Sequence, residues 1–423
     1  MHFPSFQDAT HALLESLTSF GYIPQCRPTA IASLKQHGDM VVPNLYLLLK
    51  NKSFPQHLNG VKIRPITSHH KHPFKAWASR YTRGLSVLLK LAVQALGLTL
   101  APVCLDLLGS QRWWQLAMDK YRDVPKEHLL LFEFDLDSMY YNIDQGSCLA
   151  AVREFFKLFR DIFKRRTVAI SRQDKTLDRI GSGSRELFHT IPLEDLMTFC
   201  HFELVGNSVA RVGRLAYRQT LGIPMGGLPG AALANIQLLM FELQHKAMHL
   251  TRNFFFFRYL DNLPGVLDTR LTDLNTVKKL FLQIYKMPLK LEQAGKTIDT
   301  LEMRVSLIDG RFGYASKPLL MDTIGHTIDG SVHRVPPLWC VNRKRFLNYY
   351  VPSSFLKCIR YSSNFLDFLM GVENLVIGLR DFGFLVGDIL AVMQHFFQIK
   401  CASMNLFAYI SYLLRVRLDL RPA

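Results

Sequence analysis

The chain has 423 residues, 49% of them hydrophobic, so it is long enough for two or three packed subdomains and too apolar for long disordered arms. It carries 51 Lys and Arg against 34 Asp and Glu, a formal net charge of +17, and the basic residues are spread over many segments. This excess favours a polyanionic partner such as nucleic acid over an anionic membrane surface, which one concentrated basic tract would bind.

Cysteine usage and the N-terminal segment indicate where the chain works. The seven cysteines are an odd number without a CxxC pair, which favours free thiols in a reducing compartment over disulfides or a zinc site. The opening residues MHFPSFQDATHALLESL have no basic region followed by an apolar run, so they are not typical of a secretory signal. The apolar residues 88–108 are interrupted by Lys90 and Pro102 and predict a buried helix. We therefore expect an intracellular protein, nuclear or cytoplasmic, with no membrane partner.

The first third of the chain predicts helices, a basic stretch and one central strand. Residues 1–60 have the pattern of helical segments, and the basic stretch that follows holds a short strand pattern around Val61–Ile66. Helical periodicity covers much of Tyr81–Leu108. Residues 128–134 form an apolar run with one Glu that ends at Asp135, which is typical of a strand buried on both faces.

The middle of the chain alternates helical, polar and hairpin patterns. Val152–Arg166 has the spacing of an amphipathic helix whose basic stripe is a solvated face. Residues 167–190 are polar and rich in Gly, Ser and Arg, which predicts a surface insertion or a linker. Glu203–Gln219 predicts a hairpin that turns at Gly206-Asn207. A Gly-rich loop then opens a long helix over Ala231–His245, and the last hundred residues are mainly helical in pattern.

Two strand ends present the carboxylates that carry the chemistry. The segment FEFDLDSMYYNID delivers Asp135 at the end of a strand, and FFFFRYLDNLPGVL is a strand–turn–strand with Asp261 at its tip. Two carboxylates from adjacent strand ends can hold a pair of Mg²⁺ ions about 3.5–4 Å apart, the geometry that serves phosphoryl transfer. Mg²⁺ needs only one or two carboxylates, because water and substrate phosphates complete its shell. The sequence therefore predicts a two-metal site for Mg²⁺ or Mn²⁺.

Taken together, these segments resemble the palm motifs of reverse transcriptases, and most of all those of Penelope-like elements. DLDSMYYNI resembles the first palm motif, YRQTLGIPMGGLPGAALANIQLLMFE the second, and FFRYLDNL the third. LKLEQAGKTIDTLEMRV resembles the end of the Penelope-type palm, and VKIRPITSHHKHPFKAWASRY resembles a fingers segment. The five matches occur in the family's order and cover about residues 60 to 310, which makes the resemblance far more specific than any one motif.

The resemblance implies a role for each matching residue. Asp135 and Asp261 would bind the metals, with the Leu136 carbonyl nearby, and Tyr140 would be the steric gate that selects deoxynucleotides. The remaining roles are binding of the incoming triphosphate (Lys62 and Arg64), lining of the template-base side (Gln219, Met225, Gly226 and Gly227) and proton donation to pyrophosphate (Lys296). Glycines at 226 and 227 suit that place because no Cβ keeps a base pair or sugar at a distance.

One departure from the family pattern concerns the tip of the hairpin. The second acidic residue of the family is Asn262 here, which keeps a side-chain oxygen but removes one negative charge. We expect weakened metal binding with a tilt towards Mn²⁺. Two alternatives stay open: an RNA-dependent RNA polymerase, and a nucleic-acid-binding relative without turnover, which Asn262 favours. The first normally lacks an aromatic at the Tyr140 position and has Gly where this chain has Leu260.

The architecture that the resemblance implies is an α+β right hand. Residues 1–125 would form the fingers, residues 126–308 a palm with an antiparallel sheet and an elaboration at 150–200, and residues 309–423 a helical thumb. The implied partners are an RNA template, a DNA or RNA primer and dNTPs, joined by RNA-directed DNA synthesis.

Overall fold

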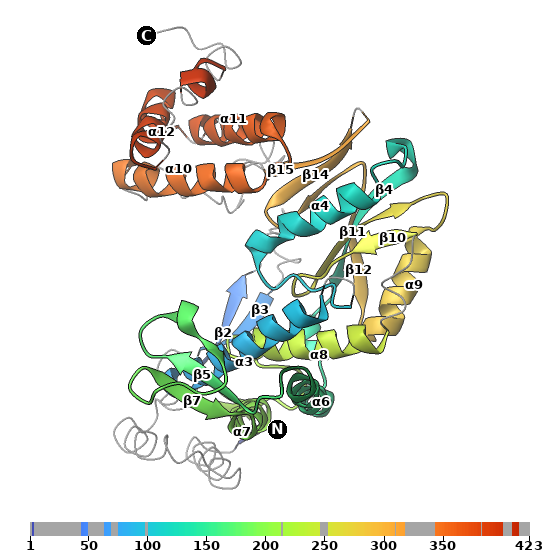
Figure 1. Cartoon of the computed structure of the whole chain (residues 1–423), viewed down its shortest axis with the longest axis vertical. Coiled ribbons are helices and arrows are strands. Elements are labelled where there is room, and N and C mark those ends of the chain that lie inside the picture. Colours follow the sequence, from blue (N-terminus) through green and yellow to red (C-terminus); the bar gives the residue numbers. More distant parts are fainter. Residues whose placement is uncertain are drawn as a thin grey trace.

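The structure is a computed structural model that describes residues 2–3, 44–49, 63–68, 75–97, 100–212, 215–245, 253–308, 310–317, 343–381, 383–400 and 408–413. Within these ranges, no helix combines the length and the apolar character that crossing a bilayer requires. Figure 1 shows an elongated molecule, with helices α10 to α12 at one end of the long axis and α6, α7, β5 and β7 at the other.

The centre of the molecule is a four-stranded antiparallel sheet in the order β10-β11-β4-β12. Its strands are β4 (Leu129–Leu136), β10 (Phe254–Phe256), β11 (Asn262–Asp268) and β12 (Leu289–Gly295). Successive side chains of β4 point to opposite faces, so Phe132, Phe134 and Leu136 join one apolar cluster while Leu129 and Leu131 join another. The prediction of a strand buried on both faces is therefore confirmed at β4.

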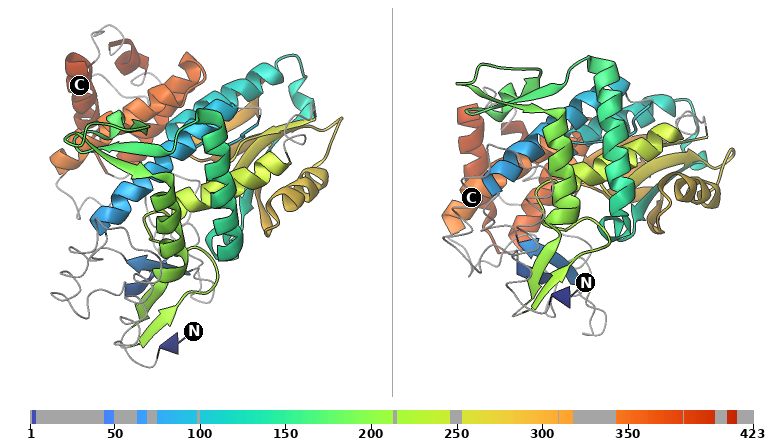
Figure 2. Two further views of the ribbon diagram at one scale, coloured as in Figure 1. Left: turned by 60° about the horizontal axis from the view of Figure 1, so that its bottom comes forward. Right: turned by 90° about the horizontal axis from the view of Figure 1, so that it is seen from below.

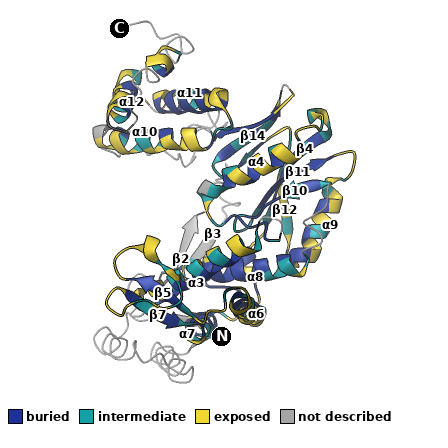
Figure 3. Ribbon diagram, in the orientation of Figure 1, coloured by how far each residue is buried: buried dark blue, intermediate teal, exposed yellow. Residues whose placement is uncertain are grey.

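Helices cover one face of this sheet. They are α6 (Gln145–Phe163), α8 (Gly230–Gln244) and α9 (Leu274–Tyr285). Helix α8 is apolar on nearly every side and is the most deeply buried of the three, whereas α6 and α9 turn polar faces outward (Figure 3). The Asp144 and Asp273 side chains cap the first turns of α6 and α9 by accepting bonds from Ser147 and Thr276 amides.

The opposite face packs against a helix and a small second sheet. These elements are the 3₁₀ turn at Leu107–Gly109, α4 (Ser110–Lys120), the 3₁₀ turn at Lys126–His128, β13 (Thr297–Thr300), β14 (Met303–Ile308) and β15 (Arg311–Ser316). The Trp113 ring stacks on Phe257, and Trp114 meets Phe257 and Phe312 edge-on. Asp135 and Asn262, on the adjacent ends of β4 and β11, are partly exposed.

The fingers sheet joins strands that are far apart in sequence. Its order is β1-β9-β8-β2-β3, with β1 (His2–Phe3), β2 (Asn44–Leu49), β3 (Ile63–Ser68), β8 (Val209–Val212) and β9 (Leu215–Arg218). Strands β8 and β9 thus pair with N-terminal strands although their residues fall in the range predicted as palm. The three domain boundaries stay a prediction.

Two further helices pack against each other. They are α3 (Lys75–Leu96) and α7 (Leu193–His201), and Figure 2 shows α3 passing close to α8. The helix predicted over Tyr81–Leu108 ends at Leu96, because Gly97 adopts a φ of +72° that a helix cannot continue. The hairpin predicted to turn at Gly206-Asn207 is also displaced. Gly206 is the last residue of a π-helix over Phe202–Gly206, and Asn207 follows it. The antiparallel strand pair is formed by β8 and β9 instead.

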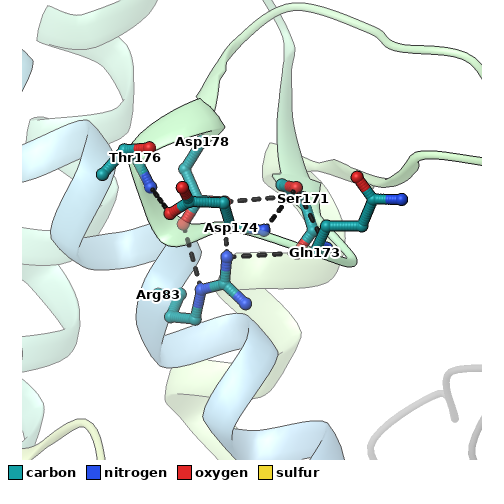
Figure 4. A network of polar contacts seen from close by, with 6 residues as sticks. All are labelled: Arg83, Ser171, Gln173, Asp174, Thr176 and Asp178. Atoms are coloured by element: carbon teal, nitrogen blue, oxygen red, sulfur yellow. Dashed lines mark hydrogen bonds and ion pairs between the residues drawn. The ribbon is translucent and has the colours of Figure 1, made fainter.

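Residues 167–190, predicted as a polar surface insertion, form a three-stranded sheet. Its strands are β5 (Thr167–Ser171), β6 (Arg179–Ile180) and β7 (Phe188–Pro192), with a 3₁₀ turn at Lys175–Leu177. One face packs on α3, where Gly84 leaves room for Val168 and Leu196. Arg83 of α3 anchors the sheet through both oxygens of Asp178, at 2.6 and 3.0 Å (Figure 4).

The C-terminal part is helical, as predicted, over the residues that the structure describes. Helices α10 (Arg343–Arg360), α11 (Phe365–Asp381) and α12 (Val386–Lys400) share an apolar cluster of their own. Charged pairs join them to the small sheet: Arg311 of β15 bonds Asp367 at 2.8 Å, and Lys357 bonds Glu302 at 3.1 Å.

Candidate active site

The register between β4 and β11 brings the two predicted carboxylates to the same end of the sheet. Asn262 lies directly opposite Asp135 in the antiparallel pair, and the Leu136 amide donates to the Asp261 carbonyl at 2.9 Å. Residues opposite each other in such a pair have Cβ atoms about 4.5–5.5 Å apart. The backbone segments that carry Asp135 and Asp261 therefore lie side by side at this end of the sheet.

The hairpin that carries Asp261 is a tight turn. Tyr259 and Asn262 exchange backbone hydrogen bonds of 2.9 and 3.0 Å, so Leu260 and Asp261 are its two central residues. Leu260 has a φ of +53°, a region that L-residues with a branched side chain rarely occupy. The Asn262 side-chain amide donates to Asp261 Oδ1 at 3.1 Å, so these two side chains touch at the tip.

A lysine that was not among the predicted site residues, Lys290, completes this face of the sheet. Lys290 of β12 is the partner of Asp135 on the side opposite Asn262, so Asn262, Asp135 and Lys290 form one row across three strands. The Lys290 ammonium bonds Glu292 at 2.5 Å. That hydrogen bond, with smaller contributions from Asp135 and Asp137, raises the pKa of Lys290. The alternation in the segment PLKLEQ puts 290 and 292 on one face, but only the register of β12 against β4 locates them beside Asp135.

Lys296 lies at the other end of the sheet, which contradicts its predicted role as proton donor. Its ammonium donates to the carbonyls of Lys126, Glu127 and Leu129 at 2.8, 2.9 and 2.6 Å. Strand β12 runs antiparallel to β4, so each step from Lys290 towards Lys296 leads away from Asp135. Leu129 and Asp135 are six strand residues apart, which is roughly 20 Å.

Tyr140 lies beside the Gly-rich loop. It belongs to the short helix α5 (Met139–Asn142), is half-buried, and its carbonyl accepts from the Ile223 amide at 2.7 Å. Gly222 has a φ of +76°, and a Cβ there would come within 2.5 Å of the Tyr140 carbonyl oxygen. The structure thus brings the predicted gate and the loop together, while the gate role itself stays a prediction.

The same loop meets the fingers strand β3. The Thr67 amide donates to the Met225 carbonyl at 2.7 Å. A Cβ on Gly226, whose φ is +97°, would lie 2.3 Å from the Thr67 carbonyl oxygen, so only glycine permits this approach. Gly227 continues the turn by donating to the Pro224 carbonyl at 3.3 Å.

The other predicted nucleotide contacts are placed less fully. The Gln219 side chain donates to the Leu221 carbonyl at 2.7 Å, and Gln145 donates to the Gln219 carbonyl at 3.4 Å, so this residue is held at the start of the loop. Arg64 lies in β3, but its side chain falls outside the described part of the chain. Lys62 lies outside the described residues altogether.

Comparisons with known proteins bear on the fold. No family model matches the sequence, and no curated protein matches it. Telomerase from Candida albicans, in complex with the TWJ fragment of telomeric RNA, is similar with a TM-score of 0.51 and 13% identity over 87% of this chain and 58% of that chain.

Two further solved structures are similar at lower scores. Apo telomerase from Candida tropicalis has a TM-score of 0.48 and 12% identity, covering 90% of this chain and 65% of that one. The RNA-dependent RNA polymerase of a human picobirnavirus has a TM-score of 0.40 and 14% identity, covering 84% and 55%. This chain spans between half and two thirds of the length of these three structures.

The likeness to the Candida albicans structure extends over most of this chain, in which helices back an antiparallel sheet. The protein has the α+β right-hand fold of the polymerases that copy nucleic-acid templates, as the sequence predicted.

Proposed function

We propose that this protein is a template-directed nucleotidyltransferase, an RNA-directed DNA polymerase that uses two divalent metal ions. The observation that carries the proposal is the register that sets Asn262 opposite Asp135 and joins Leu136 to Asp261. It supports a shared site for two carboxylates that are 126 residues apart in the chain.

The residues at this strand end fit a magnesium or manganese site. Asp135 and Asp261 would supply carboxylate oxygens, and the Asn262 amide and the Leu136 carbonyl, on the same strand ends, would supply neutral oxygens. Among the described residues, no group of three or more His, Cys, Asp or Glu side chains gathers to hold a metal. Hard oxygen donors in small number suit Mg²⁺, which keeps several waters and binds substrate phosphates. Two such ions, when bound, stabilise the attacking and leaving oxygens of phosphoryl transfer.

The other residues of the site would position the substrates. Tyr140 would exclude a ribose 2′-hydroxyl, while Met225, Gly226 and Gly227 would line the template base and Gln219 would support that loop. Lys62 and Arg64 would bind the triphosphate from the fingers. Lys290 takes the place predicted for Lys296, because it is the lysine that lies beside Asp135.

Nucleic acid is the proposed partner, as an RNA template with a DNA or RNA primer and dNTPs. The net charge of +17 supports binding to a phosphate backbone. The protein would recognise an A-form hybrid by its shape and backbone. The wide, shallow minor groove of such a duplex presents 2′-hydroxyls, which do not identify the base sequence. The residues of the palm motifs further support a Penelope-like relationship. We propose an intracellular localisation, either nuclear or cytoplasmic.

Asn262 supports a second candidate, a nucleic-acid-binding relative that has lost turnover. Asn262 removes one negative charge, and Lys290 adds a positive one beside Asp135. Both effects weaken the binding of a divalent cation. For the first candidate, the polymerase, we therefore propose an active site with weak Mg²⁺ affinity and higher activity with Mn²⁺.

Primer extension on homopolymer template–primers tests the proposal. Purified protein is assayed with dNTPs or NTPs, in Mg²⁺ and in Mn²⁺, beside Asp135→Ala. Extension with dNTPs that Asp135→Ala abolishes, without changing salt-sensitive RNA binding, supports a DNA polymerase. Preference for NTPs supports an RNA polymerase, and RNA binding without extension in either metal supports the relative without turnover.

The contribution of Asn262 is tested separately with Asn262→Asp. The restored charge is expected to raise extension in Mg²⁺ by about 10-fold and to change extension in Mn²⁺ less. Equal Mg²⁺ activity of the two proteins would reject a weakened metal site.

A further inference from the structure

Arg258 lies at the start of the hairpin turn and is completely buried. Alternation along the strand puts it on the same face as Phe254 and Phe256, towards helices α8 and α9, while Tyr259 and Asn262 form the neighbouring bridge. A guanidinium in this place is costly unless every donor finds an acceptor and its charge is balanced. The surroundings of Arg258 supply both.

The balancing charge comes from Glu242 of α8. Arg258 Nε donates to Glu242 Oε1 at 2.5 Å and Nη2 donates to Oε2 at 3.3 Å. The Tyr285 hydroxyl of α9 also donates to Glu242 Oε1, at 2.9 Å, and Arg258 Nη1 donates to Asn235 Oδ1 at 2.6 Å. Burial lowers the pKa of Arg258, but Glu242 outweighs this, so the pKa is raised and the group stays charged.

The same guanidinium reaches the turn that carries Asp261. Arg258 Nη1 donates to the carbonyl of Leu260 at 3.2 Å, and Leu260 is the residue with positive φ. That backbone conformation is strained for a residue with a side chain and persists only where the surroundings hold it. The backbone of Arg258 is itself fastened, because its amide donates to Pro102 and its carbonyl accepts from Cys104 at 2.7 and 2.8 Å.

We propose that Arg258, Glu242, Asn235 and Tyr285, together the Arg258 clamp, position the hairpin turn so that Asp261 meets Asp135. The inference rests on the proposed function, since it assigns a task within the same site. A buried ion pair is by itself weak evidence for stability, because apolar residues of similar volume often replace such pairs without loss. An apolar replacement cannot supply the bond to the Leu260 carbonyl. The clamp is therefore expected to govern metal binding and turnover more than stability.

The paired variant Arg258→Met/Glu242→Gln removes both charges together, and the introduced glutamine keeps an acceptor for the Tyr285 hydroxyl. We expect kcat to fall about 10–100-fold, because small misplacements of a metal ligand have effects of that size. The KM for dNTP is expected to stay within about twofold, since the clamp does not touch the nucleotide. Binding of Mn²⁺ alone, followed by electron paramagnetic resonance of the free ion, is expected to weaken about 10-fold.

A matched control exists in the Arg83–Asp178 pair of Figure 4. There too a guanidinium bonds both carboxylate oxygens and one backbone carbonyl, that of Ser171 at 3.1 Å, but the pair joins α3 to the β5–β7 sheet. The same exchange, Arg83→Met/Asp178→Asn, is expected to leave Mn²⁺ binding and kcat unchanged. An equal loss in the control would overturn the clamp and indicate a general effect on folding.

Arg258→Lys keeps the charge beside Glu242 but removes the planar fork that reaches Asn235 and Leu260. It covers the case in which the paired variant does not fold, and the same loss of Mn²⁺ affinity and kcat is expected. Wild-type values in a folded Arg258→Lys protein or in the paired variant would overturn the clamp while leaving the polymerase proposal intact. A wild-type protein that neither binds Mn²⁺ nor extends a primer would overturn the proposed function, and the clamp with it.

Discussion

Two arginine–carboxylate pairs in this molecule have nearly the same bonding and very different surroundings. In Arg258–Glu242 and in Arg83–Asp178, the guanidinium bonds both carboxylate oxygens and a backbone carbonyl. The side chains of the first pair are fully buried, whereas Arg83 is 25% exposed and Asp178 6% exposed. Water can therefore take over the role of either partner in the second pair but not in the first. The same bond geometry has different consequences at the two sites.

The two pairs also support different parts of the molecule. The carbonyl that Arg258 bonds belongs to the turn before Asp261, and the carbonyl that Arg83 bonds ends strand β5. The first pair lies beneath the proposed metal site, and the second fastens an accessory sheet to α3. Changes near the hairpin should therefore alter chemistry, and equivalent changes on the β5–β7 sheet should alter only local stability.

The largest difference is expected between two single carboxylate exchanges. Asp261→Asn should lower primer extension by about 10³-fold, because a metal ligand contributes several kcal/mol to the transition state. Asp178→Asn should leave extension unchanged. Both rates are measured with the same template–primer, and thermal melting verifies that each variant is folded. Extension by Asp261→Asn within a few-fold of wild type would remove Asp261 from the site.

The second difference concerns stability. Arg258→Ala leaves Glu242 charged and buried, so the free energy of unfolding should fall by about 3–5 kcal/mol. Arg83→Ala should lower it by about 1–2 kcal/mol, because Asp178 gains contact with water. Urea denaturation of both variants measures the two values. Similar losses would show that burial does not separate the pairs.

A buried glutamate with no cationic partner among the described residues extends the comparison to pH. Glu203 is fully buried and accepts from the Asn207 amide at 3.3 Å; burial raises its pKa to about 7. The folded state then holds a proton that the unfolded state has released, so this carboxyl makes the protein less stable as pH rises from about 4.5 to about 7. The loss is about 3 kcal/mol, and Glu203→Gln should lack it.

Denaturation of wild type and Glu203→Gln at several pH values measures that contribution as the difference between the two curves. The difference should change between pH 4.5 and 7 and stay constant above. A pH-independent difference would mean that Glu203 titrates normally, as an exposed carboxyl does.

The smallest difference is expected between two glycines of similar backbone conformation. Gly226 and Gly181 have φ values of +97° and +90°, but a Cβ at 226 meets the Thr67 carbonyl whereas one at 181 meets nothing within 4 Å. Both alanine variants bear the strain of positive φ, and Gly226→Ala should be less stable than Gly181→Ala by about 2 kcal/mol. Comparison of their melting curves tests this, and equal values would show that β3 can withdraw from the loop.

Local patterns in the sequence predicted what depends on single segments. The apolar run before Asp135 and the aromatic strands around Asp261 predicted both strands and, through the family resemblance, their pairing. Relations between distant segments were not accessible. The sequence does not show that Lys290 rather than Lys296 lies beside Asp135, because this placement depends on the register of β12 against β4.

The same limit applies to buried polar residues and to the accessory sheet. Arg258 has an ordinary place in the segment RYLDN, and only the packing of α8 and α9 shows that its side chain points into the core. The polar segment at 167–190 contains few apolar residues, and its strands rely on α3 for their apolar contacts. The π-helix at Phe202–Gly206 stands where a hairpin turn was predicted, and Glu203 within it is buried.

The order of strands in the fingers sheet has a consequence for synthesis of the chain. Strand β2 pairs with β3, which is synthesised soon after it. The other neighbour of β2 is β8, which begins only at Val209, and β1 pairs with the still later strand β9. Until a ribosome has translated past Arg218, the edges of the early strands stay without their final neighbours, and open edges favour association with other chains. Expression of fragments that stop before Val209 should therefore yield aggregates, and slow translation through this interval should demand chaperones.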